Sequence, residues 1–370
     1  MKVGTVKEIK RMEFRVGLTP ANVQEYVGNG HQVFVQSGAG MGSALTDEDY
    51  AAAGATILST AKEVWDTCDM IVKVKEPLPD EYELMRENQI IYTYLHLAAD
   101  KALTDKLLEK KTKAIAYETI RDAKGGLPLL KPMSEVAGKM AVQAGSRCLE
   151  KIMGGRGQLL GGVPGVPKGN VVIIGAGAVG VSALKVALGM GANVTIIDRD
   201  LNRLTYLDDI YGQQIQTMYS TQYNIEQAIF QADLVVGAIL IPGAAATKLI
   251  RREHLKKMKP GAVIVDVAVD QGGCCETTKM TYHDDPVFVV DGVVHYCVAN
   301  MPGAVSLTST YALTNATLGY GIKIANMGVE EASKSDPGLA LGVNCYKGKL
   351  TCEEVARDFG MEYAALNTLI

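Results

Sequence analysis

Short, almost continuous apolar runs alternate with amphipathic stretches along the first 120 residues. The apolar runs predict strands of a parallel sheet, because such strands are covered on both faces and have few polar positions. A helix is expected to start at Thr19-Pro20, where a capping hydroxyl precedes a proline in the first turn, and to end at Gly28 or Gly30. The other expected elements are strands at Val3–Val6, Gln32–Gln36, Met70–Lys75, Ile90–Leu95 and Ala114–Tyr117, and helices at Asp80–Glu87 and Lys101–Lys110.

The same rhythm restarts after a stretch rich in glycine and proline, Gly154–Gly169, which reads as a loop between domains. Before it, Ser134-Glu135 is expected to cap a long connecting helix that ends near Met153. After it, strands are expected at Val171–Ile174, Asn193–Ile197, Leu234–Ala238, Ala262–Val267, Val287–Val290 and Val293–Val298. The tail reads as helical at Thr308–Met327, Leu339–Val343 and Cys352–Phe359.

This order of elements predicts an α/β fold with two doubly wound, parallel-sheet, Rossmann-like domains. The tail holds too few strands for a third sheet, so we expect it to pack back on the first domain. The first domain is then discontinuous, with residues 1–127 completed by the C-terminal helices of 306–370. The second domain is expected to span residues 128–305.

Composition excludes several classes of protein. The chain has 370 residues and a formal net charge of −4, which argues against a nucleic-acid binder. Its seven cysteines form no Cys-x-x-Cys pair, so the sequence predicts neither a disulfide framework nor a zinc site, and a reduced, cytoplasmic setting is expected. No signal peptide is expected after Met1. The apolar stretch Val171–Ala192 contains Lys185 and several glycines, so a strand, a turn and a helix explain it better than a membrane span.

That stretch carries a dinucleotide-binding pattern. A predicted strand is followed by Gly175-Ala-Gly177-Ala-Val-Gly180 and a helix, and Asp198 ends the next strand. In this pattern Gly175 permits a tight turn, Gly177 lets the backbone approach a pyrophosphate, and Gly180 lets helix and strand pack closely, while the helix N-terminus attracts the phosphates. A carboxylate that accepts both ribose hydroxyls favours NAD over NADP. Arg199 leaves the alternative open, because an arginine there also suits a 2′-phosphate.

Three other strand ends of the second domain are expected to line the nicotinamide half of the site, because ligands of such sheets lie outside the carboxyl ends of the strands. They are Ala238-Ile239-Leu240, Val267-Ala268-Val269-Asp270 and Val298-Ala299-Asn300-Met301.

Reactive side chains follow the strands of the first domain. Arg15 lies in the loop after the first strand, while Lys75 and His96 end later ones. Arginine binds carboxylates through its planar fork, lysine polarises a carbonyl or imine, and histidine moves protons near neutral pH. A cleft between the two sheet edges would add Asp270 to this group, which suits a small anion that bears a carbonyl.

Each of these residues also has an ordinary structural explanation. Arg15 is found in a charged stretch, Lys75 ends an alternating Lys-Val-Lys run, a single histidine near a core strand is more often structural, and Asp270 could cap the following turn. Their shared topological position favours the functional interpretation. Glu118 also ends a strand, but no cluster near it has metal-ligand spacing, so no metal is expected.

The chain resembles the alanine dehydrogenase family, which includes the NAD-binding part of proton-translocating nicotinamide nucleotide transhydrogenase. The resemblance runs from Met1 to about Gly328. It rests on Lys7-Glu8, Glu13-Phe-Arg15-Val-Gly-Leu-Thr-Pro20, Val74-Lys75-Glu76-Pro77, Leu95-His96-Leu-Ala-Ala99, Pro132-Met-Ser-Glu-Val-Ala-Gly138, Gly161-Gly-Val-Pro-Gly165, Asp266-Val-Ala-Val-Asp-Gln-Gly-Gly273 and Cys297-Val-Ala-Asn-Met-Pro302. Departures are Val6, where the family often has proline, Met12, where it often has asparagine, and Lys279-Met280, where Arg-Pro is common.

The resemblance implies reversible oxidative deamination of L-alanine to pyruvate and ammonium with NAD, in a homohexamer. It assigns Arg15 and Lys75 to substrate binding, and His96 and Asp270 to acid–base catalysis. It adds cofactor neighbours, which are Ser134, Ala178, Val179, Arg203, Ser220, Ile239, Leu240, Val267, Lys279 and Val298 to Met301. The departure at Lys279 puts the cofactor contact at that position in doubt.

Three alternatives remain open at this point. The chain could be a hydride-transfer module that serves a transhydrogenase-like partner, although the His96 motif and the absence of a membrane segment before Ile370 disfavour this. It could act on another amino acid, because sequence does not fix pocket size. It could also bind NAD without turnover, which retention of Arg15, Lys75, His96 and Asp270 disfavours.

Overall fold

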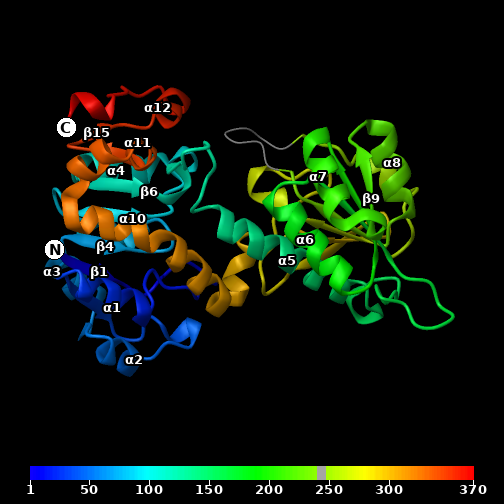
Figure 1. The fold of residues 1–370 in the computed structure, drawn as a ribbon, viewed down its shortest axis with the longest axis horizontal. Helices are drawn as coiled ribbons and strands as arrows, with labels where there is room; N and C mark the ends of the chain where they lie inside the picture. The colour runs from blue at the N-terminus through cyan, green and yellow to red at the C-terminus, as the bar shows by residue number, and fades with distance from the viewer. Residues whose placement is uncertain (240–246) are drawn as a thin grey trace. The chain divides into compact units, whose positions relative to one another are not determined.

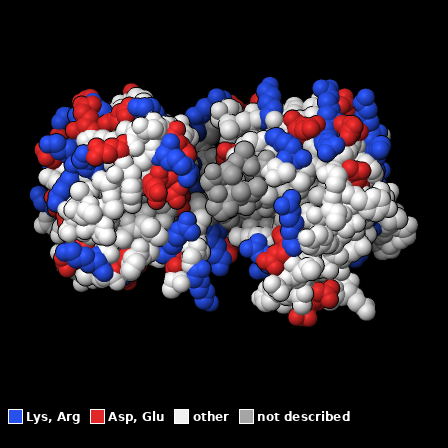
Figure 2. Space-filling view, turned by 90° about the horizontal axis from the view of Figure 1, so that it is seen from above, with Lys and Arg blue, Asp and Glu red and all other residues white. Residues whose placement is uncertain are grey.

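The computed structural model describes residues 1–239 and 247–370, which divide into two compact units. The first unit comprises Met1–Met133 and Gly303–Ile370, and the second comprises Ser134–Pro302. The first unit is therefore blue to cyan and orange to red in Figure 1, since its two segments lie far apart in the sequence. Figure 2 shows Lys and Arg interspersed with Asp and Glu on the visible face of each unit.

The sheet of the first unit has the strand order β15-β14-β6-β5-β4-β1-β2-β3. Strands β1 to β6 run parallel, whereas β14 pairs antiparallel with β6 and β15 antiparallel with β14. The bounds are β1 (Lys2–Thr5), β2 (Gln32–Gln36), β3 (Thr56–Leu58), β4 (Met70–Val72), β5 (Ile90–Thr93), β6 (Lys113–Ala116), β14 (Val343–Tyr346) and β15 (Lys349–Leu350).

Helices of both chain segments pack on this sheet. α1 begins as predicted, with the Thr19 side chain accepting the Asn22 backbone N–H. The long α10, orange in Figure 1, packs closely on α1, since a Cβ at Gly321 would lie 2.0 Å from Tyr26 Oη. The bounds are α1 (Pro20–Gly28), α2 (Asp47–Ala52), α3 (Ala61–Thr67), α4 (Lys101–Glu109), α10 (Ser306–Ser335), α11 (Pro337–Ala340) and α12 (Glu353–Phe359), with short 3₁₀ turns η1 (Met41–Ser43), η2 (Pro79–Leu84), η3 (Leu97–Ala99), η4 (Tyr117–Thr119), η8 (Met301–Val305) and η9 (Leu366–Thr368).

The sheet of the second unit has the order β12-β13-β11-β10-β7-β8-β9, and its strands are parallel except for β12. The strands are β7 (Asn170–Ile174), β8 (Asn193–Asp198), β9 (Ile215–Tyr219), β10 (Leu234–Gly237), β11 (Val263–Asp266), β12 (Val287–Val290) and β13 (Val293–Tyr296). The helices are α5 (Lys131–Cys148), which begins three residues before this unit, α6 (Ala178–Gly189), α7 (Leu201–Tyr211), α8 (Gln222–Gln231) and α9 (Arg252–Leu255), with η5 (Lys151–Met153), η6 (Gly212–Gln214) and η7 (Val267–Gln271).

Both sheets reverse their winding direction at one point. In the first, β1 leads outward to β2 and β3, whereas β4 leads the other way to β5 and β6. In the second, the reversal lies between β7 and β10. Open α/β sheets bind ligands at such reversals, outside the carboxyl ends of the strands.

The α/β, Rossmann-like prediction is confirmed, but some elements differ from expectation. The predicted helix at Leu339–Val343 is wrong, because α11 ends at Ala340 and β14 begins at Val343. The C-terminal segment therefore adds two antiparallel strands as well as helices. The predicted helix at Asp80–Glu87 is instead the 3₁₀ turn η2, in which Glu81 is buried against Lys73.

The expected helix cap at Ser134 is also wrong. α5 begins at Lys131, because Pro132 fits the first turn, where helical N–H groups have no intrahelical partner. The short strand β3 and the edge strand β9 were not predicted, since both are only partly buried and lack a continuous apolar run. None of the helices in the described ranges has the length and apolar character needed to span a bilayer, and Val171–Ala192 forms β7, α6 and the start of the next loop.

Candidate active site

The reversal point of the first sheet brings three predicted residues together. Arg15 lies in the loop after β1, Lys75 follows β4 and His96 follows β5. The charges of Arg15 and Lys75 both act on the His96 imidazole, and that of Arg15 acts on Lys75, so the three side chains lie within electrostatic range of one another. Arginine, lysine and histidine at one sheet edge are side chains whose chemistry suits a small carboxylate.

The Arg15 guanidinium is buried and already paired. Its Nε and Nη2 each donate to one carboxylate oxygen of Glu13, both at 2.6 Å. Arg15 is 2% exposed, and its Nη1 lies 2.9 Å from Met133 Sδ. One edge of the guanidinium is therefore used by Glu13.

Lys75 is held through its backbone by a buried carboxylate. Glu8 Oε1 accepts the backbone N–H groups of Val74 at 2.6 Å and Lys75 at 3.3 Å. The other oxygen of Glu8 lies 3.2 Å from Lys73 Nζ, which also donates to Glu81 at 2.8 Å. The Lys73 side chain is fully buried, so this charged triad fixes the main chain at Lys75 from inside the fold.

His96 is held in the same manner by Glu118. Glu118 Oε1 accepts the backbone N–H groups of Leu95 at 3.0 Å and His96 at 2.6 Å. His96 has φ 51°, in the left-handed region that L-residues seldom adopt. Because backbone strain of this kind gathers at functional sites, the conformation of His96 supports a functional role.

Burial and nearby positive charges shift the pKa values of both basic groups. Desolvation, followed by the charges of Arg15 and Lys10, lowers the pKa of Lys75. Desolvation, followed by Lys75, Lys10 and Arg15, lowers the pKa of His96 to about 3. Although 46% of the His96 side chain is exposed, the three cations all act in this direction, so the imidazole is neutral at physiological pH. A neutral imidazole has a lone pair available to accept a proton.

The glycine loop of the second unit fits a pyrophosphate. Gly175 has φ 109°, and a Cβ there would lie 2.6 Å from Ala238 O, across the reversal point. A Cβ at Gly180 would lie 1.8 Å from Gly175 O, so helix α6 packs directly on the turn. Among the described residues, a Cβ at Gly177 would meet Arg203 Nη1 alone, at 4.0 Å. The space over Gly177, at the N-terminus of α6, is therefore where phosphate groups fit.

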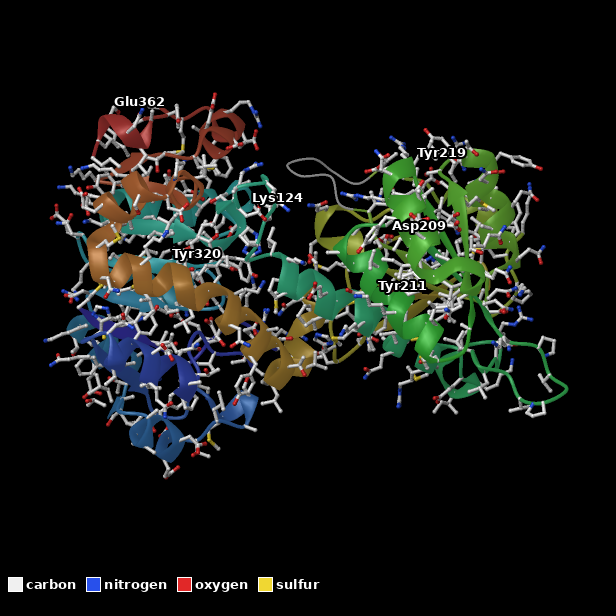
Figure 3. The ribbon with its side chains drawn as sticks, viewed as in Figure 1. Lys124, Asp209, Tyr211, Tyr219, Tyr320 and Glu362 are labelled. Carbon is white, nitrogen blue, oxygen red and sulfur yellow. The ribbon has the colours of Figure 1, made fainter. Side chains whose placement is uncertain are left out.

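The end of β8 places an acidic side chain beside the glycine loop. Asp198 Oδ2 accepts the Ala176 N–H at 2.5 Å and Oδ1 accepts the Asp200 N–H at 2.8 Å, which joins this carboxylate to the glycine loop. Its register partner is Tyr219, labelled in Figure 3 at the end of β9, and Ser220 follows. Ser220 N–H donates to Asp198 O at 2.9 Å. Asp198, Ser220 and Arg203 thus lie near one another beside the glycine loop.

The loop after β11 is organised by Asp266, a residue that sequence reasoning did not single out. Asp266 is fully buried, and its Oδ2 accepts the backbone N–H of Cys274 at 2.8 Å and the Thr278 hydroxyl at 2.5 Å. Its Oδ1 accepts the Ala268 N–H. These bonds hold η7, in which Ala268 and Val269 are buried and Asp270 is exposed.

The remaining predicted cofactor residues lie in several places. Ser134 is the fourth residue of α5, and Ala178 and Val179 begin α6, which α5 contacts closely at Gly138. Ile239 is partly buried beside β10, and Leu240 lies outside the described residues. Val298, Ala299, Asn300 and Met301 follow β13, and Asn300 has φ 57°.

Lys279 lines a surface hollow of about 590 Å³ together with Arg252, Phe288 and Asp291. Within the described residues, none of the other predicted cofactor residues lines this hollow.

The predicted residues thus form a substrate-type group on the first unit and a dinucleotide-type group, with Asp270, on the second. The cleft expected to join them stays a prediction. Sequence reasoning missed the carboxylates that hold the site, which are Glu8, Glu13, Glu76, Asp266 and, as a backbone acceptor, Glu118. Four of these five lie inside the motifs that carry the family resemblance, which was the available signal.

Comparisons with known proteins agree with the fold. The family model described as "Alanine dehydrogenase/PNT, N-terminal domain" matches residues 4–137, and "Alanine dehydrogenase/PNT, C-terminal domain" matches residues 141–353. The chain is 56% identical to an alanine dehydrogenase of Methanococcus maripaludis over 98% of both chains, and 52% identical to one of Halomonas elongata over the whole of both. A solved L-alanine dehydrogenase superposes with a TM-score of 0.95 at 49% identity, covering 97% of this chain and 99% of that one. A transhydrogenase from Sinorhizobium meliloti, 23% identical with a TM-score of 0.82 over 95% of this chain and 99% of its own, shares the fold.

Proposed function

The chain belongs to the alanine dehydrogenase/PNT family, and from that premise we propose that it catalyses the reversible, NAD-dependent oxidative deamination of L-alanine to pyruvate and ammonium. The observation that carries the proposal is the grouping of Arg15, Lys75 and His96 at the reversal point of the first sheet. It supplies a carboxylate-binding fork, a carbonyl-binding cation and a neutral base in one place.

Family membership implies a nicotinamide cofactor, and we propose NAD because the acidic Asp198 ends β8 beside the glycine loop. Bound NAD supplies a hydride acceptor for the Cα hydrogen of alanine. The proposed cofactor residues are those of the sequence prediction, with Gly177 and Asp198 at the pyrophosphate and ribose. In this proposal residues 128–305 form the cofactor domain, and residues 1–127 with 306–370 carry the substrate groups.

Side chains of this protein carry out the remaining steps of the proposed reaction. Arg15 holds the alanine carboxylate. Loss of the hydride leaves an iminium, and a water activated by His96, with Asp270 assisting, adds to its carbon. The water proton passes to the imidazole. As the carbinolamine collapses, the imidazolium returns that proton to the nitrogen and the hydroxyl proton also moves to it, so ammonium leaves and pyruvate remains with its carbonyl oxygen beside Lys75.

The assembly is proposed on the resemblance alone, and the cellular setting on the cysteine usage of the chain. We infer a homohexamer in the cytoplasm, with alanine, pyruvate and ammonium as its small-molecule partners and with no nucleic acid, membrane or metal. Size-exclusion chromatography coupled to light scattering measures the subunit number directly.

The test is absorbance at the NADH band with purified protein, NAD and L-alanine at alkaline pH. Parallel reactions contain L-lysine, L-glutamate or L-leucine in place of alanine, or NADP in place of NAD. We expect NADH to form with alanine and NAD only, and His96→Ala to lose about 10²–10⁴ in rate. Tight NADH binding without turnover of any amino acid would contradict the proposal and favour a hydride-transfer module.

A further inference from the structure

Glu76 lies directly after Lys75, and its carboxylate lies between Lys10 and His96. The residue is 8% exposed. Its Oε1 bonds to Lys10 Nζ, which fixes the orientation of the carboxylate. Its Oε2 lies 3.6 Å from His96 Nδ1, and in the part of the chain that the structure describes it has no hydrogen-bond partner. Burying a carboxylate oxygen without a hydrogen bond costs free energy of folding. A functional role beside the imidazole would explain why this oxygen is placed there.

Two contacts position His96. Its main chain is held by Glu118, and the Tyr94 ring packs against it with the ring centroids 5.8 Å apart. The two nitrogens of an imidazole point in divergent directions, so a ring that directs Nδ1 toward Glu76 directs Nε2 away from it. The nitrogen that a neighbouring group fixes as N–H determines which one is left to accept a proton.

We propose that Glu76 is the positioning residue of His96, and that its Oε2 accepts a hydrogen bond from Nδ1–H so that Nε2 carries the lone pair. The present 3.6 Å is too long for such a bond, and the ring has to move by about 0.7 Å to form it. Hydrogen bonds between catalytic groups commonly tighten when the substrate binds.

The inference rests on the proposed function, in which the water oxygen bonds to the iminium carbon while a water proton passes to His96 Nε2. The imidazolium that results faces three cations, Lys75, Lys10 and Arg15, all of which oppose its charge. The negative charge of Glu76, beside Nδ1, counteracts these three positive charges. The other carboxylate at this residue, Glu118, binds the main chain of His96 instead. The Nδ1 proton stays on the histidine throughout, so the Glu76 carboxylate orients and stabilises the imidazolium without taking a proton.

The test uses the full-length enzyme with two substitutions, Glu76→Gln and Glu76→Ala, and one matched control. Glu83→Gln is the control because Glu83 is an exposed glutamate that also pairs with lysines, Lys106 and Lys110. For Glu76→Ala we expect kcat for alanine oxidation to fall on the order of 10²-fold while KM for alanine changes little. Glu76→Gln keeps an acceptor oxygen, so its kcat falls less.

The pH profile separates this role from a purely structural one. Removing the negative charge of Glu76 lowers the pKa of the imidazole in the complex, so the acid limb of kcat in Glu76→Gln moves to lower pH. Glu83→Gln keeps the wild-type profile. If Glu76→Ala does not fold, as judged by circular dichroism and NADH binding, the profile of Glu76→Gln decides.

An unchanged acid limb, or a rise in KM with normal kcat, would overturn the inference and assign Glu76 to substrate binding through Lys10 or Lys75. A wild-type enzyme that does not oxidise alanine would instead overturn the proposed function. The two failures are therefore distinguishable.

Discussion

Glu118 holds His96 by its main chain, with the carboxylate Oε1 accepting the His96 N–H at 2.6 Å. The bond keeps His96 at φ 51°, a conformation that costs an L-residue about 1–2 kcal/mol. Glu8 repeats the arrangement at Lys75, whose N–H it accepts together with that of Val74. Because β6, β5, β4 and β1 are neighbours in this order, each carboxylate reaches across from the adjacent strand end. At both Lys75 and His96, a carboxylate thus positions the reactive side chain by binding the backbone N–H of that residue.

Glu118→Ala is expected to reduce kcat by about 10²-fold, because His96 loses the bond that fixes its backbone. It also leaves the backbone N–H groups of Leu95 and His96 without this acceptor, which lowers the urea midpoint of unfolding. Glu118→Gln keeps an acceptor oxygen and retains most of the activity. Equal losses in the two variants would show that the charge of Glu118, and not its backbone bonds, sets the rate.

The lowered pKa of Lys75 leads us to expect that substrate binding depends on pH. Its pKa lies below the ordinary value of 10.5 because of desolvation and the charges of Arg15 and Lys10. Since lowering a pKa brings deprotonation to lower pH, the KM for pyruvate should start to rise at a pH below 10.5. In Lys75→Arg the charge persists, so this alkaline rise disappears even if KM is higher throughout. The exposed Lys124, labelled in Figure 3, is the control, and Lys124→Arg should keep the wild-type profile.

Glu13 is expected to support both stability and substrate affinity. Glu13→Gln leaves the buried Arg15 guanidinium without its matching anion, and breaking a buried pair in this way costs about 3–5 kcal/mol. We expect a lower midpoint in urea and a higher KM for pyruvate, with a smaller change in kcat. Glu25→Gln, on the exposed face of α1, serves as control. A normal KM in Glu13→Gln would show that Arg15 needs no help from Glu13 to bind substrate.

The sequence predicted the parts of the site that depend on local spacing. Gly175, Gly177 and Gly180 could be assigned separate roles before the structure, because a strand, a turn and a helix follow one another within a few residues. Arg15, Lys75 and His96 could be placed at one edge because the βαβ rhythm predicts a parallel sheet, in which the carboxyl ends of the strands lie at the same edge. The holding carboxylates could not be predicted. Glu8 accepts the N–H of a residue 66 positions away, and no periodicity encodes that distance.

The misassigned elements have a similar cause. The apolar–polar alternation in Val343–Tyr346 is too short to outweigh the helical composition around it. The segment nevertheless forms a strand, because it pairs with the edge of β6. Ser134 resembles a helix cap locally, but the helix begins about one turn earlier, at Lys131, with Pro132 in its first turn. In both cases tertiary context or a competing local signal decided the outcome.

Substitutions of two glycines in the glycine loop are expected to have different effects, one on stability and the other on NADH affinity. Gly180→Ala places a Cβ 1.8 Å from Gly175 O, so we expect a large loss of stability or no soluble protein. Gly177→Ala meets open space, so the protein should fold normally and lose affinity for NADH, because the added methyl group occupies the room for a phosphate. Thermal unfolding and NADH fluorescence titration measure the two effects. Normal NADH affinity in Gly177→Ala would place the pyrophosphate elsewhere.

The backbone conformation of Met12 suggests a substitution that should stabilise the protein. It has φ 58°, a left-handed conformation that asparagine tolerates better than methionine because its short polar side chain bonds locally. This gives a physical meaning to the asparagine that is common at this position in the family. We expect Met12→Asn to raise the free energy of unfolding by about 0.5–1 kcal/mol, measured by urea denaturation. Met41→Asn, at an exposed methionine whose backbone φ is negative, should stay within about 0.5 kcal/mol of wild type. If Met12→Asn gains no more than Met41→Asn, the side-chain contacts of Met12 offset its backbone strain and the argument from φ fails.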